Sequence, residues 1–482
     1  MTFTSPVFLF VFLPVILAAH FLIRKEFRNL LLFLASSVFY FYGEQKMLAL
    51  MYFVIFINWL TALGIDYLKN NTNRFKPIYM KIITVGCIAI CIGLLWYFKY
   101  WNFTLHLFND IANILDISYR ITKFDKIILP LGISFYTFHV LSYTLDVYMG
   151  KMKADKNLLN FATYVLMFPQ LVAGPIVRYI DIQKQFIERT ITPLGAANGF
   201  RRFCFGMGKK ILIANTVAKA ADKIFALNAA QIDMATAWLG AVCYTLQIYF
   251  DFSGYSDMAI GLAMMFGFHY KENFNYPYIS KTVGEFWRRW HISLSTWLRD
   301  YVYINMGGNR VSVFRFCANT LFVFLLSGLW HGANLTFVLW GIWYGIFIIL
   351  EKLFLKNFLA DKKWLAHFYA LLVIVFGWVM FRSDTVTYAL KYWIAMIGIN
   401  GIDIDKALSF TQNDIYAAIT LGTFFSFDWR SLYKKFVVGT KTSHTRFFVF
   451  KIISYVTAVF IFILSLTSIM SSTYNPFIYF RF

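Results

Sequence analysis

The sequence predicts an all-α, polytopic membrane protein of roughly ten to twelve transmembrane or re-entrant helices. Hydrophobic residues make up 59% of the 482-residue chain and charged residues 14%, whereas soluble domains contain about 25% charged residues. The mean hydropathy is +0.60. A soluble fold of this composition would have to expose large apolar patches, which soluble proteins avoid. We therefore exclude a soluble enzyme, a disordered chain and a secreted disulfide scaffold.

The net charge of +21 has the distribution expected of a membrane protein. Basic residues lie in short loops between apolar stretches, as they do in cytoplasmic loops that face anionic lipid. We therefore expect membrane lipid as a partner and no nucleic acid. The five cysteines lie mostly inside apolar runs, which favours small core residues over disulfides or ligands.

Apolar segments that could each cross a membrane follow one another along the chain, because one span needs about 20 such residues. They are 5–23, 29–43, 47–67, 78–100, 127–149, 158–177, 235–268, 318–350, 364–381 and 447–470, with weaker candidates at 386–399 and 411–426. No internal repeat or low-complexity linker divides them. We therefore expect a single membrane-embedded domain, with N-terminal spans in 1–126, a motif-bearing core in 127–350 and C-terminal spans in 351–482.

A basic insert occupies residues 178–223 and has two interpretations. It contains nine basic and three acidic residues. A helix lying on anionic headgroups is the favoured interpretation. The alternative is a cytoplasmic dock for a phosphate-bearing donor, because lysine and arginine suit phosphates.

Polar residues interrupt the apolar segment 235–268 at Asp251-Phe-Ser-Gly-Tyr-Ser-Asp257. The two aspartates are most of two helical turns apart, so one uninterrupted helix face holds both poorly, and Gly254 is a candidate for a local break. Satisfied structural carboxylates are favoured over direct catalysis, because no basic residue lies within the stretch. Asp251 is kept as a candidate substrate-binding residue.

Residues 283–303 predict one helix that is too polar to face lipid. Thr282 and Glu285 have the spacing of a capping box. Trp287, His291 and Ser295 recur at four-residue steps, so a continuous helix would place them along one stripe.

The apolar run 318–350 contains Ser327-Gly-Leu-Trp-His-Gly-Ala-Asn334. One helix of this length would reach about 46 Å, against a hydrocarbon core of about 30 Å, so it must tilt or break, and Gly328 and Gly332 are natural break points. We expect His331 near mid-membrane, flanked by small residues that let a ligand approach. An ionisable group in such a run is by default a functional candidate.

The two motif histidines, His291 and His331, favour general base chemistry over a metal site. No third ligand accompanies either one at zinc-like spacing, whereas a base needs only one neutral imidazole, and burial keeps its pKa low. We therefore expect no metal.

Seven sequence blocks carry a resemblance to a known family. They are Pro130-Leu-Gly-Ile-Ser-Phe-Tyr-Thr-Phe, Phe168-Pro-Gln-Leu-Val-Ala-Gly-Pro-Ile-Val-Arg178, Asp251-Phe-Ser-Gly-Tyr-Ser-Asp257, Asn273-Phe-Asn-Tyr-Pro-Tyr278, Phe286-Trp-Arg-Arg-Trp-His-Ile-Ser-Leu-Ser295, Gly307-Gly-Asn-Arg310 and Leu329-Trp-His-Gly-Ala333. They resemble the membrane-bound O-acyltransferase family and, more narrowly, its bacterial alginate O-acetyltransferase branch. The tail Asn475-Pro-Phe-Ile-Tyr-Phe480 adds a weaker match.

The resemblance implies a ring of helices around a central tunnel and an acetyltransferase activity. The principal catalytic histidine of the family corresponds to His331 and the second motif histidine to His291. The acyl donor is expected to be a cytoplasmic thioester, acetyl-CoA, with no tightly bound cofactor. The expected acceptor is an exported polysaccharide, alginate-like or another cell-surface polymer, reached through an extracytoplasmic partner acetyltransferase. The expected location is the bacterial inner membrane.

Residues in or beside these blocks are candidates for binding substrate. They are Trp287, Arg288, Arg289, Trp290, Ser295, Trp330, Asn334 and Asp251. For the two arginines, phosphate binding competes with a helix-packing ion pair between Glu285 and Arg289.

Two alternative functions stay open at this point. One is D-alanyl transfer to teichoic acid from a carrier protein, by a related branch. The other is a polysaccharide or lipid transporter without acyl chemistry.

Overall fold

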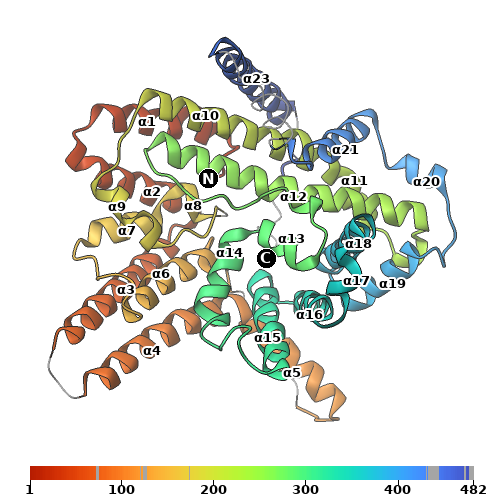
Figure 1. Cartoon of the computed structure of the whole chain (residues 1–482), viewed down its shortest axis with the longest axis horizontal. Coiled ribbons are helices and arrows are strands. Elements are labelled where there is room, and N and C mark those ends of the chain that lie inside the picture. Colours follow the sequence, from red (N-terminus) through yellow and green to blue (C-terminus); the bar gives the residue numbers. More distant parts are fainter. Residues whose placement is uncertain are drawn as a thin grey trace. The chain divides into compact units, whose positions relative to one another are not determined.

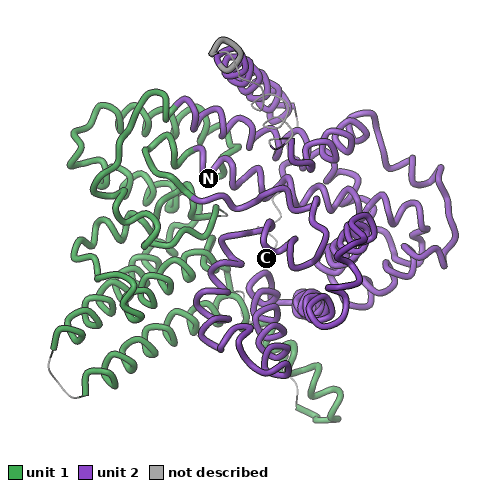
Figure 2. Tube along the Cα trace, in the orientation of Figure 1, with its two compact units in different colours: residues 1–196, 262–270 green, residues 197–261, 271–482 purple. Residues whose placement is uncertain are grey.

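The computed structural model describes residues 1–71, 75–119, 121–122, 127–172, 174–429, 431, 444–471 and 474–476. Every regular element in these ranges is helical (Figure 1). The chain forms two compact units: residues 1–196 with 262–270, and residues 197–261 with 271–482 (Figure 2). The predicted all-α class is confirmed. The predicted boundary at 126 falls outside the described ranges, as do residues 477–480 of the tail motif.

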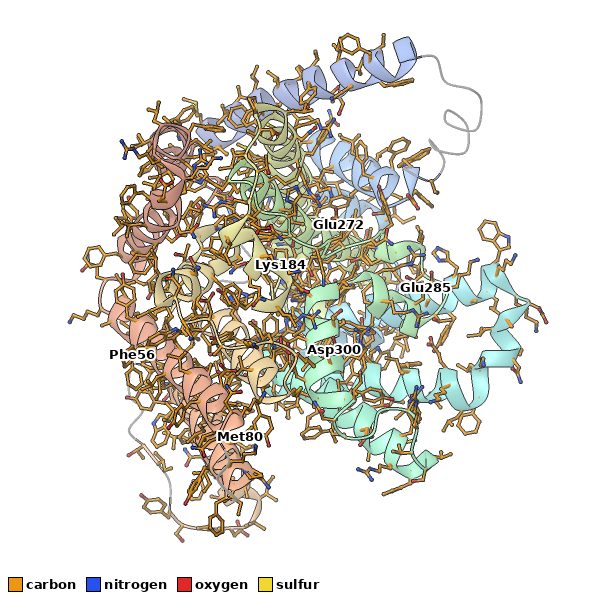
Figure 3. The ribbon with its side chains drawn as sticks, turned by 60° about the vertical axis from the view of Figure 1, so that its left-hand side comes forward. Phe56, Met80, Lys184, Glu272, Glu285 and Asp300 are labelled. Carbon is orange, nitrogen blue, oxygen red and sulfur yellow. The ribbon has the colours of Figure 1, made fainter. Side chains whose placement is uncertain are left out.

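The first unit contains helices α1 to α9. They are α1 (Leu13–Leu22), α2 (Arg28–Glu44), α3 (Met47–Lys69), α4 (Lys76–Leu95), α5 (Trp101–Ile114), α6 (Ile133–Tyr148), α7 (Leu158–Leu166), α8 (Phe168–Leu171) and α9 (Tyr179–Ile187). The long helices α3 and α4 lie side by side, with Phe56 and Met80 labelled on them in Figure 3. The Phe56 side chain is 50% exposed, as suits a lipid-facing helix. The predicted span 158–177 is broken at Met167, where the backbone leaves the helical region (ψ 112°).

The second unit contains the remaining helices, except that the first residues of α10 and the last residues of α12 belong to the first unit. They are α10 (Pro193–Gly208), α11 (Asn215–Phe225), α12 (Met234–Met265), α13 (Val283–Arg289), α14 (Ile292–Leu298), α15 (Val313–His331), α16 (Leu335–Leu350), α17 (Lys356–Ala360), α18 (Lys363–Arg382), α19 (Val386–Met396), α20 (Ile404–Ser409), α21 (Asn413–Phe425) and α23 (His444–Ser471).

The predicted break at Gly254 is wrong, because α12 runs without interruption from Met234 to Met265. Instead, Gly254 lies where α12 packs closely against α10. A Cβ at Gly254 would lie 2.7 Å from the carbonyl oxygen of Gly206 in α10, a distance that real Cβ atoms do not tolerate. The missing side chains therefore let two backbones pack against each other.

Six helical stretches in the described part of the chain are long and apolar enough to cross a membrane. They are Met47–Lys69, Lys76–Ile114, Val313–His331, Leu335–Ala360, Lys363–Arg382 and Phe448–Ser471. The protein is thus a multi-pass, helical membrane protein. The full count of ten to twelve elements stays a prediction.

Several cations of the basic insert form ion pairs inside the second unit. Arg202 and Lys209 reach Asp257 at 2.8 and 2.6 Å, and Lys219 reaches Asp414 at 3.0 Å. The choice between a headgroup-binding helix and a donor dock stays open for the remaining cations.

Candidate active site

His331 is the last residue of α15, at the turn of a helical hairpin. The run 318–350 does break, as its length requires, but at Gly332, whose backbone is extended (φ −163°, ψ 154°). Asn334 then caps α16 by accepting a hydrogen bond from the Thr336 N–H at 3.1 Å. The predicted break at Gly332 is therefore confirmed, and the position of His331 near mid-membrane stays a prediction.

The imidazole of His331 is enclosed by aromatic rings of the second unit. Its centroid lies 4.9 Å from Trp330, 5.1 Å from Trp340 and 5.2 Å from Phe381. The residue is only 4% exposed. The site therefore excludes bulk water from the ring, which strengthens electrostatic interactions there.

Phe337 occupies the space beside the two glycines near His331. This differs from the expectation that these glycines leave room for a ligand. A Cβ at Gly332 would lie 2.1 Å from the ring of Phe337, and one at Gly328 would lie 2.2 Å from the carbonyl oxygen of Phe337. These small residues let α15 and α16 pack at close range.

His291 lies between α13 and α14, in the left-handed region with φ 43° and ψ 53°. The predicted capping box does start α13, since the Thr282 side chain accepts a hydrogen bond from the Glu285 N–H at 2.9 Å. The predicted continuous helix over 283–303 is wrong, because this residue interrupts it. A non-glycine residue in this conformation costs about 1–3 kcal/mol and persists only where its surroundings enforce it.

The segment that begins at Asn273 holds this break in place. The Asn275 N–H donates to the Arg289 carbonyl, and the Ile292 N–H donates to the Asn273 carbonyl, both at 2.9 Å. Backbone pairing on both sides of His291 therefore fixes its unusual conformation.

The side chain of Asn273 also sets the protonation pattern of the His291 ring. Asn273 Oδ1 accepts from the Ser293 N–H at 3.1 Å, and a backbone N–H can only donate, so this contact fixes the amide orientation. The same oxygen lies 3.2 Å from His291 Nδ1. Nδ1 must therefore carry the hydrogen, which leaves the lone pair of the neutral ring on Nε2.

His291 Nε2 is buried and has no hydrogen-bond partner among the described residues. Burial lowers the pKa of His291 to about 3, so the ring is neutral at pH 7. Buried polar atoms are normally hydrogen-bonded, and exceptions need an explanation. An unpaired lone pair suits a group that accepts a hydrogen bond or a proton from a substrate.

The rings of His291 and His331 lie 6.5 Å apart between centroids. A hydroxyl oxygen hydrogen-bonded to an imidazole nitrogen lies about 4 Å from that ring's centroid. The spacing therefore permits one oxygen to contact both rings. Among the described residues, no three histidine, cysteine or acidic side chains form a metal site.

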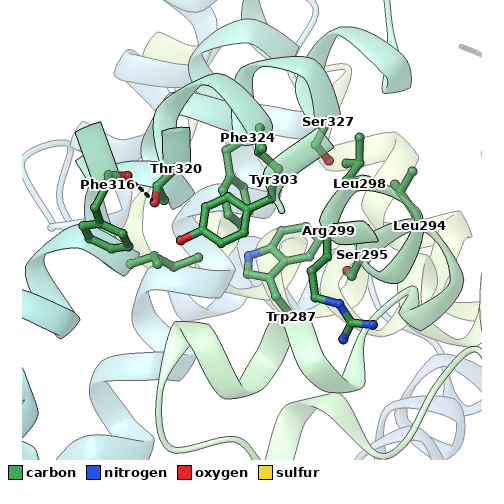
Figure 4. A pocket seen from close by; sticks show the side chains of 12 residues that line it. Trp287, Leu294, Ser295, Leu298, Arg299, Tyr303, Phe316, Thr320, Phe324 and Ser327 are labelled. Carbon is green, nitrogen blue, oxygen red and sulfur yellow. Dashed lines mark hydrogen bonds between the residues drawn. The ribbon is translucent and has the colours of Figure 1, made fainter. Parts of the chain in front are cut away.

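A cavity of about 200 Å³ lies between α13, α14, α15 and α16, and neither histidine is among the residues that line it (Figure 4). Its lining is mostly apolar, with Trp287, Ser295, Arg299 and Ser327 among the residues that form it. Ser327 is one turn before His331 on α15, and the Trp287 ring lies 5.5 Å from Trp340, which contacts His331. The structure thus brings the predicted Trp287 and Ser295 to one cavity near the histidines.

The other predicted residues have different surroundings. Arg289 forms the expected ion pair with Glu285 at 2.9 Å, while Arg288 is exposed. Trp290 is buried and stacks on Phe286, with centroids 5.5 Å apart.

Three further candidates are also placed by the structure. Trp330 lies against both histidine rings, 5.7 Å from His291. Asn334 is the cap described above. Asp251 forms a buried ion pair with Lys210, at 2.5 Å.

Sequence reasoning missed Asn273, Trp340 and Phe381. Asn273 belongs to a block that resembles the family, but nothing in its neighbours indicates a contact with a histidine 18 residues later. The two aromatic residues lie in apolar runs in which no position stands out.

The comparison with known proteins identifies the family. The family model of membrane-bound O-acyltransferases matches residues 152–384. The probable alginate O-acetylase of Pseudomonas aeruginosa is 45% identical over 401 residues, covering 82% of this chain and 75% of that protein. The chain belongs to the membrane-bound O-acyltransferase family. It is therefore an O-acyltransferase, and the resemblance of its sequence blocks is confirmed.

Other known proteins are similar to this chain over different lengths. The probable alginate O-acetylase of Pseudomonas putida is 38% identical over the full length of both chains. The peptidoglycan O-acetyltransferase of Helicobacter pylori is 35% identical, over 83% of this chain and 81% of that protein. The teichoic acid D-alanyltransferase of Bacillus subtilis is 29% identical over 49% of this chain and 62% of that protein.

Proposed function

We propose that this protein is a bacterial inner-membrane O-acetyltransferase that moves an acetyl group from acetyl-CoA, on the cytoplasmic side, toward an exported polysaccharide. The observation that carries the proposal is the pair of buried imidazoles, 6.5 Å apart within aromatic rings. Its similarity to alginate O-acetylases and a peptidoglycan O-acetyltransferase supports acetyl as the group and a cell-surface polymer as the final acceptor.

The chemistry assigned to His331 is general base catalysis. A thioester is already activated, whereas a hydroxyl is a poor nucleophile until its proton is removed. The hydroxyl oxygen attacks the thioester carbonyl carbon while His331 accepts its proton. The carbon–sulfur bond then breaks, and the proton passes to the departing thiolate, which leaves an ester and free coenzyme A thiol.

His291 is assigned to positioning the acyl donor, because the single proton of the acceptor hydroxyl goes to His331. Its tautomer places a lone pair on Nε2, which accepts a hydrogen bond from an N–H group of the donor's acyl-thioester arm. Asn273 is then a positioning residue, because it acts through His291.

The cavity between α13, α14, α15 and α16 is assigned to the acyl-thioester arm of the donor. Its apolar lining suits a slender chain, and Trp287 and Ser295 from the predicted set belong to it. Trp330, which contacts both histidines, borders the acyl group.

Delivery to the polymer requires a further step, which we assign to an extracytoplasmic partner acetyltransferase. D-alanyl transfer to teichoic acid stays the second candidate, supported by a 29% identical relative that matches about half of the chain. Membership of an acyltransferase family favours both over a transporter without acyl chemistry.

The test compares acyl groups on the surface polymers of cells that express wild-type protein, His331→Ala or His269→Ala. His269 is an exposed histidine and serves as the matched control. Mass spectrometry of the released acyl groups should give acetate for wild type and the control, and background for His331→Ala at equal membrane abundance. Release of D-alanine would replace the acetyl proposal with the second candidate, and full acetylation in His331→Ala would remove this residue from the mechanism.

A further inference from the structure

Three basic side chains gather in the first unit, outside the histidine site. His20 is on α1, Arg28 begins α2, and Arg189 follows α9. Both guanidinium groups lie close enough to the His20 ring to act on it electrostatically. Burial and the positive charge of Arg28 lower the pKa of Arg189 to about 10.

No acidic side chain of the described residues compensates this charge. Neither arginine forms an ion pair there, and Glu26 and Glu188, the acidic residues nearest to them in the sequence, are exposed. Positive groups that are partly buried together without an acid repel one another. The arrangement therefore favours an anion from outside the described chain.

The cluster also contains buried donors with nothing to donate to. Arg28 Nε, Arg189 Nε and Arg189 Nη2 have no hydrogen-bond partner among the described residues. Neither ring nitrogen of His20, which is fully buried, has such a partner, and its neutral ring supplies one further N–H donor. Such atoms are normally hydrogen-bonded in a folded protein, so their convergence indicates a ligand.

The guanidinium of Arg189 is held in a fixed position by its other contacts. Its Nη1 donates to Asn29 Oδ1 at 2.6 Å, and its Cζ atom lies 4.6 Å from the ring centroid of Phe268. Asn29 is itself anchored, since its Nδ2 donates to Asn160 Oδ1 at 2.9 Å and to the Phe186 carbonyl at 3.0 Å. The edge of the guanidinium that carries Nε and Nη2 has no hydrogen-bond partner among the described residues. The two parallel N–H groups on this edge can together bind two oxygens of one oxyanion.

We propose that His20, Arg28 and Arg189 form a phosphate-binding site, in which Arg189 holds two phosphate oxygens and the other two side chains contact the group from α1 and α2. The phosphate can belong to an anionic lipid headgroup or to a soluble phosphate compound. A lipid is the expected source, because the neighbouring Leu22 is 86% exposed and Phe27 is 50% exposed, as suits contact with acyl chains. The site is separate from the proposed acetyl transfer.

The test uses purified full-length protein in neutral detergent and measures thermal stability and affinity with three probes. The probes are short-chain phosphatidylglycerol, phosphatidylcholine of equal chain length and inorganic phosphate. Phosphatidylglycerol should stabilise the wild type more than phosphatidylcholine does, with at least tenfold weaker affinity in Arg28→Gln and Arg189→Gln. Stabilisation by inorganic phosphate that equals this effect and needs the same arginines would assign the site to a soluble phosphate compound.

Arg24→Gln is the matched control, because this exposed arginine lies four residues before Arg28. It should bind like the wild type. Arg189→Lys keeps the charge but cannot bind two phosphate oxygens with parallel N–H groups, so it should lose part of the affinity. This variant replaces Arg189→Gln in the test if Arg189→Gln does not fold. Wild-type affinity in both Arg28→Gln and Arg189→Lys, or an equal loss in Arg24→Gln, would overturn the proposal. Neither readout requires acyl transfer, so a failure here is distinct from a failure of the proposed function.

Discussion

Replacement of Asn273 by alanine tests how the histidine site is organised. The Asn273 Oδ1 atom accepts from His291 Nδ1 at 3.2 Å, from the Ser293 N–H at 3.1 Å and from the Ser293 hydroxyl at 2.9 Å. The ring N–H keeps the Ser293 hydroxyl oxygen within reach, since Oγ lies 3.4 Å from Nδ1, but the backbone N–H of Ser293 loses its partner. An unsatisfied buried donor costs about 1–3 kcal/mol, so Asn273→Ala should lower the free energy of unfolding by about 1–3 kcal/mol.

The same change should impair acyl transfer beyond its effect on stability. Without Asn273 Oδ1, His291 is free to carry its hydrogen on Nε2, where it no longer accepts a hydrogen bond. Loss of such an orienting contact typically costs about 10- to 100-fold in activity. Thiol release from acetyl-CoA by purified protein, at a temperature where the variant stays folded, measures this loss.

Asn273→Asp separates a role in positioning from a role in folding. The carboxylate can accept the same three hydrogen bonds, and its negative charge favours the imidazolium, so it should raise the pKa of His291 from about 3 by roughly 1 to 3 pH units. Protonation removes the Nε2 lone pair. Activity should therefore fall on acidification at a higher pH than in the wild type.

Ser256→Ala is the control for both variants, because the Ser256 hydroxyl accepts from the amide nitrogen of Asn273, at 3.2 Å, so this change leaves the Oδ1 contacts in place. It should keep the wild-type rate and pH profile. The reasoning fails if Asn273→Ala retains the wild-type rate and Asn273→Asp retains the wild-type pH profile.

Three further changes probe packing, charge and the cavity. In Gly328→Ala the new Cβ would lie 2.2 Å from the Phe337 carbonyl oxygen, so thermal unfolding should show a loss of about 1–3 kcal/mol; an unchanged midpoint would contradict this hairpin packing. Asp251→Asn removes the charge that pairs with buried Lys210 and should lower the free energy of unfolding by about 3–5 kcal/mol. The double variant with Asp251→Leu and Lys210→Met should recover much of this loss. Equal losses in the single and the double variant would argue against a stabilising ion pair. Trp287→Phe reshapes the cavity and should raise the KM for acetyl-CoA more than it lowers kcat; steady-state kinetics that show the reverse would remove the donor from this cavity.

The sequence predicts the helical class and the start of α13, because both depend on local patterns. Apolar runs indicate membrane-spanning helices, and the pair Thr282 and Glu285 indicates a helix N-cap within four residues. The break at His291 is different, since it depends on pairing with Asn273 and Asn275, which precede it by 18 and 16 residues. No pattern within 283–303 contains that information.

Ion pairs between residues far apart in the chain cannot be predicted from local sequence patterns either. The stretch around Asp251 contains no basic residue, and its partner Lys210 comes 41 residues earlier in the chain. The sequence favours a structural role for this carboxylate but does not indicate that Lys210 satisfies it.

The aromatic enclosure shows the same limit at the centre of the site. His331 stands out in the sequence because it is ionisable within an apolar run. Trp340 and Phe381 contact its ring from α16 and α18, yet among many aromatic residues neither has a distinguishing pattern.

The most direct measurement of the central proposal is the single-turnover rate of acetyl transfer by purified His331→Gln. Loss of a general base typically reduces the rate by about 10²- to 10⁴-fold, so we expect a reduction in this range with little change in the midpoint of thermal unfolding. A transfer rate equal to that of the wild type would show that this imidazole does not take the proton.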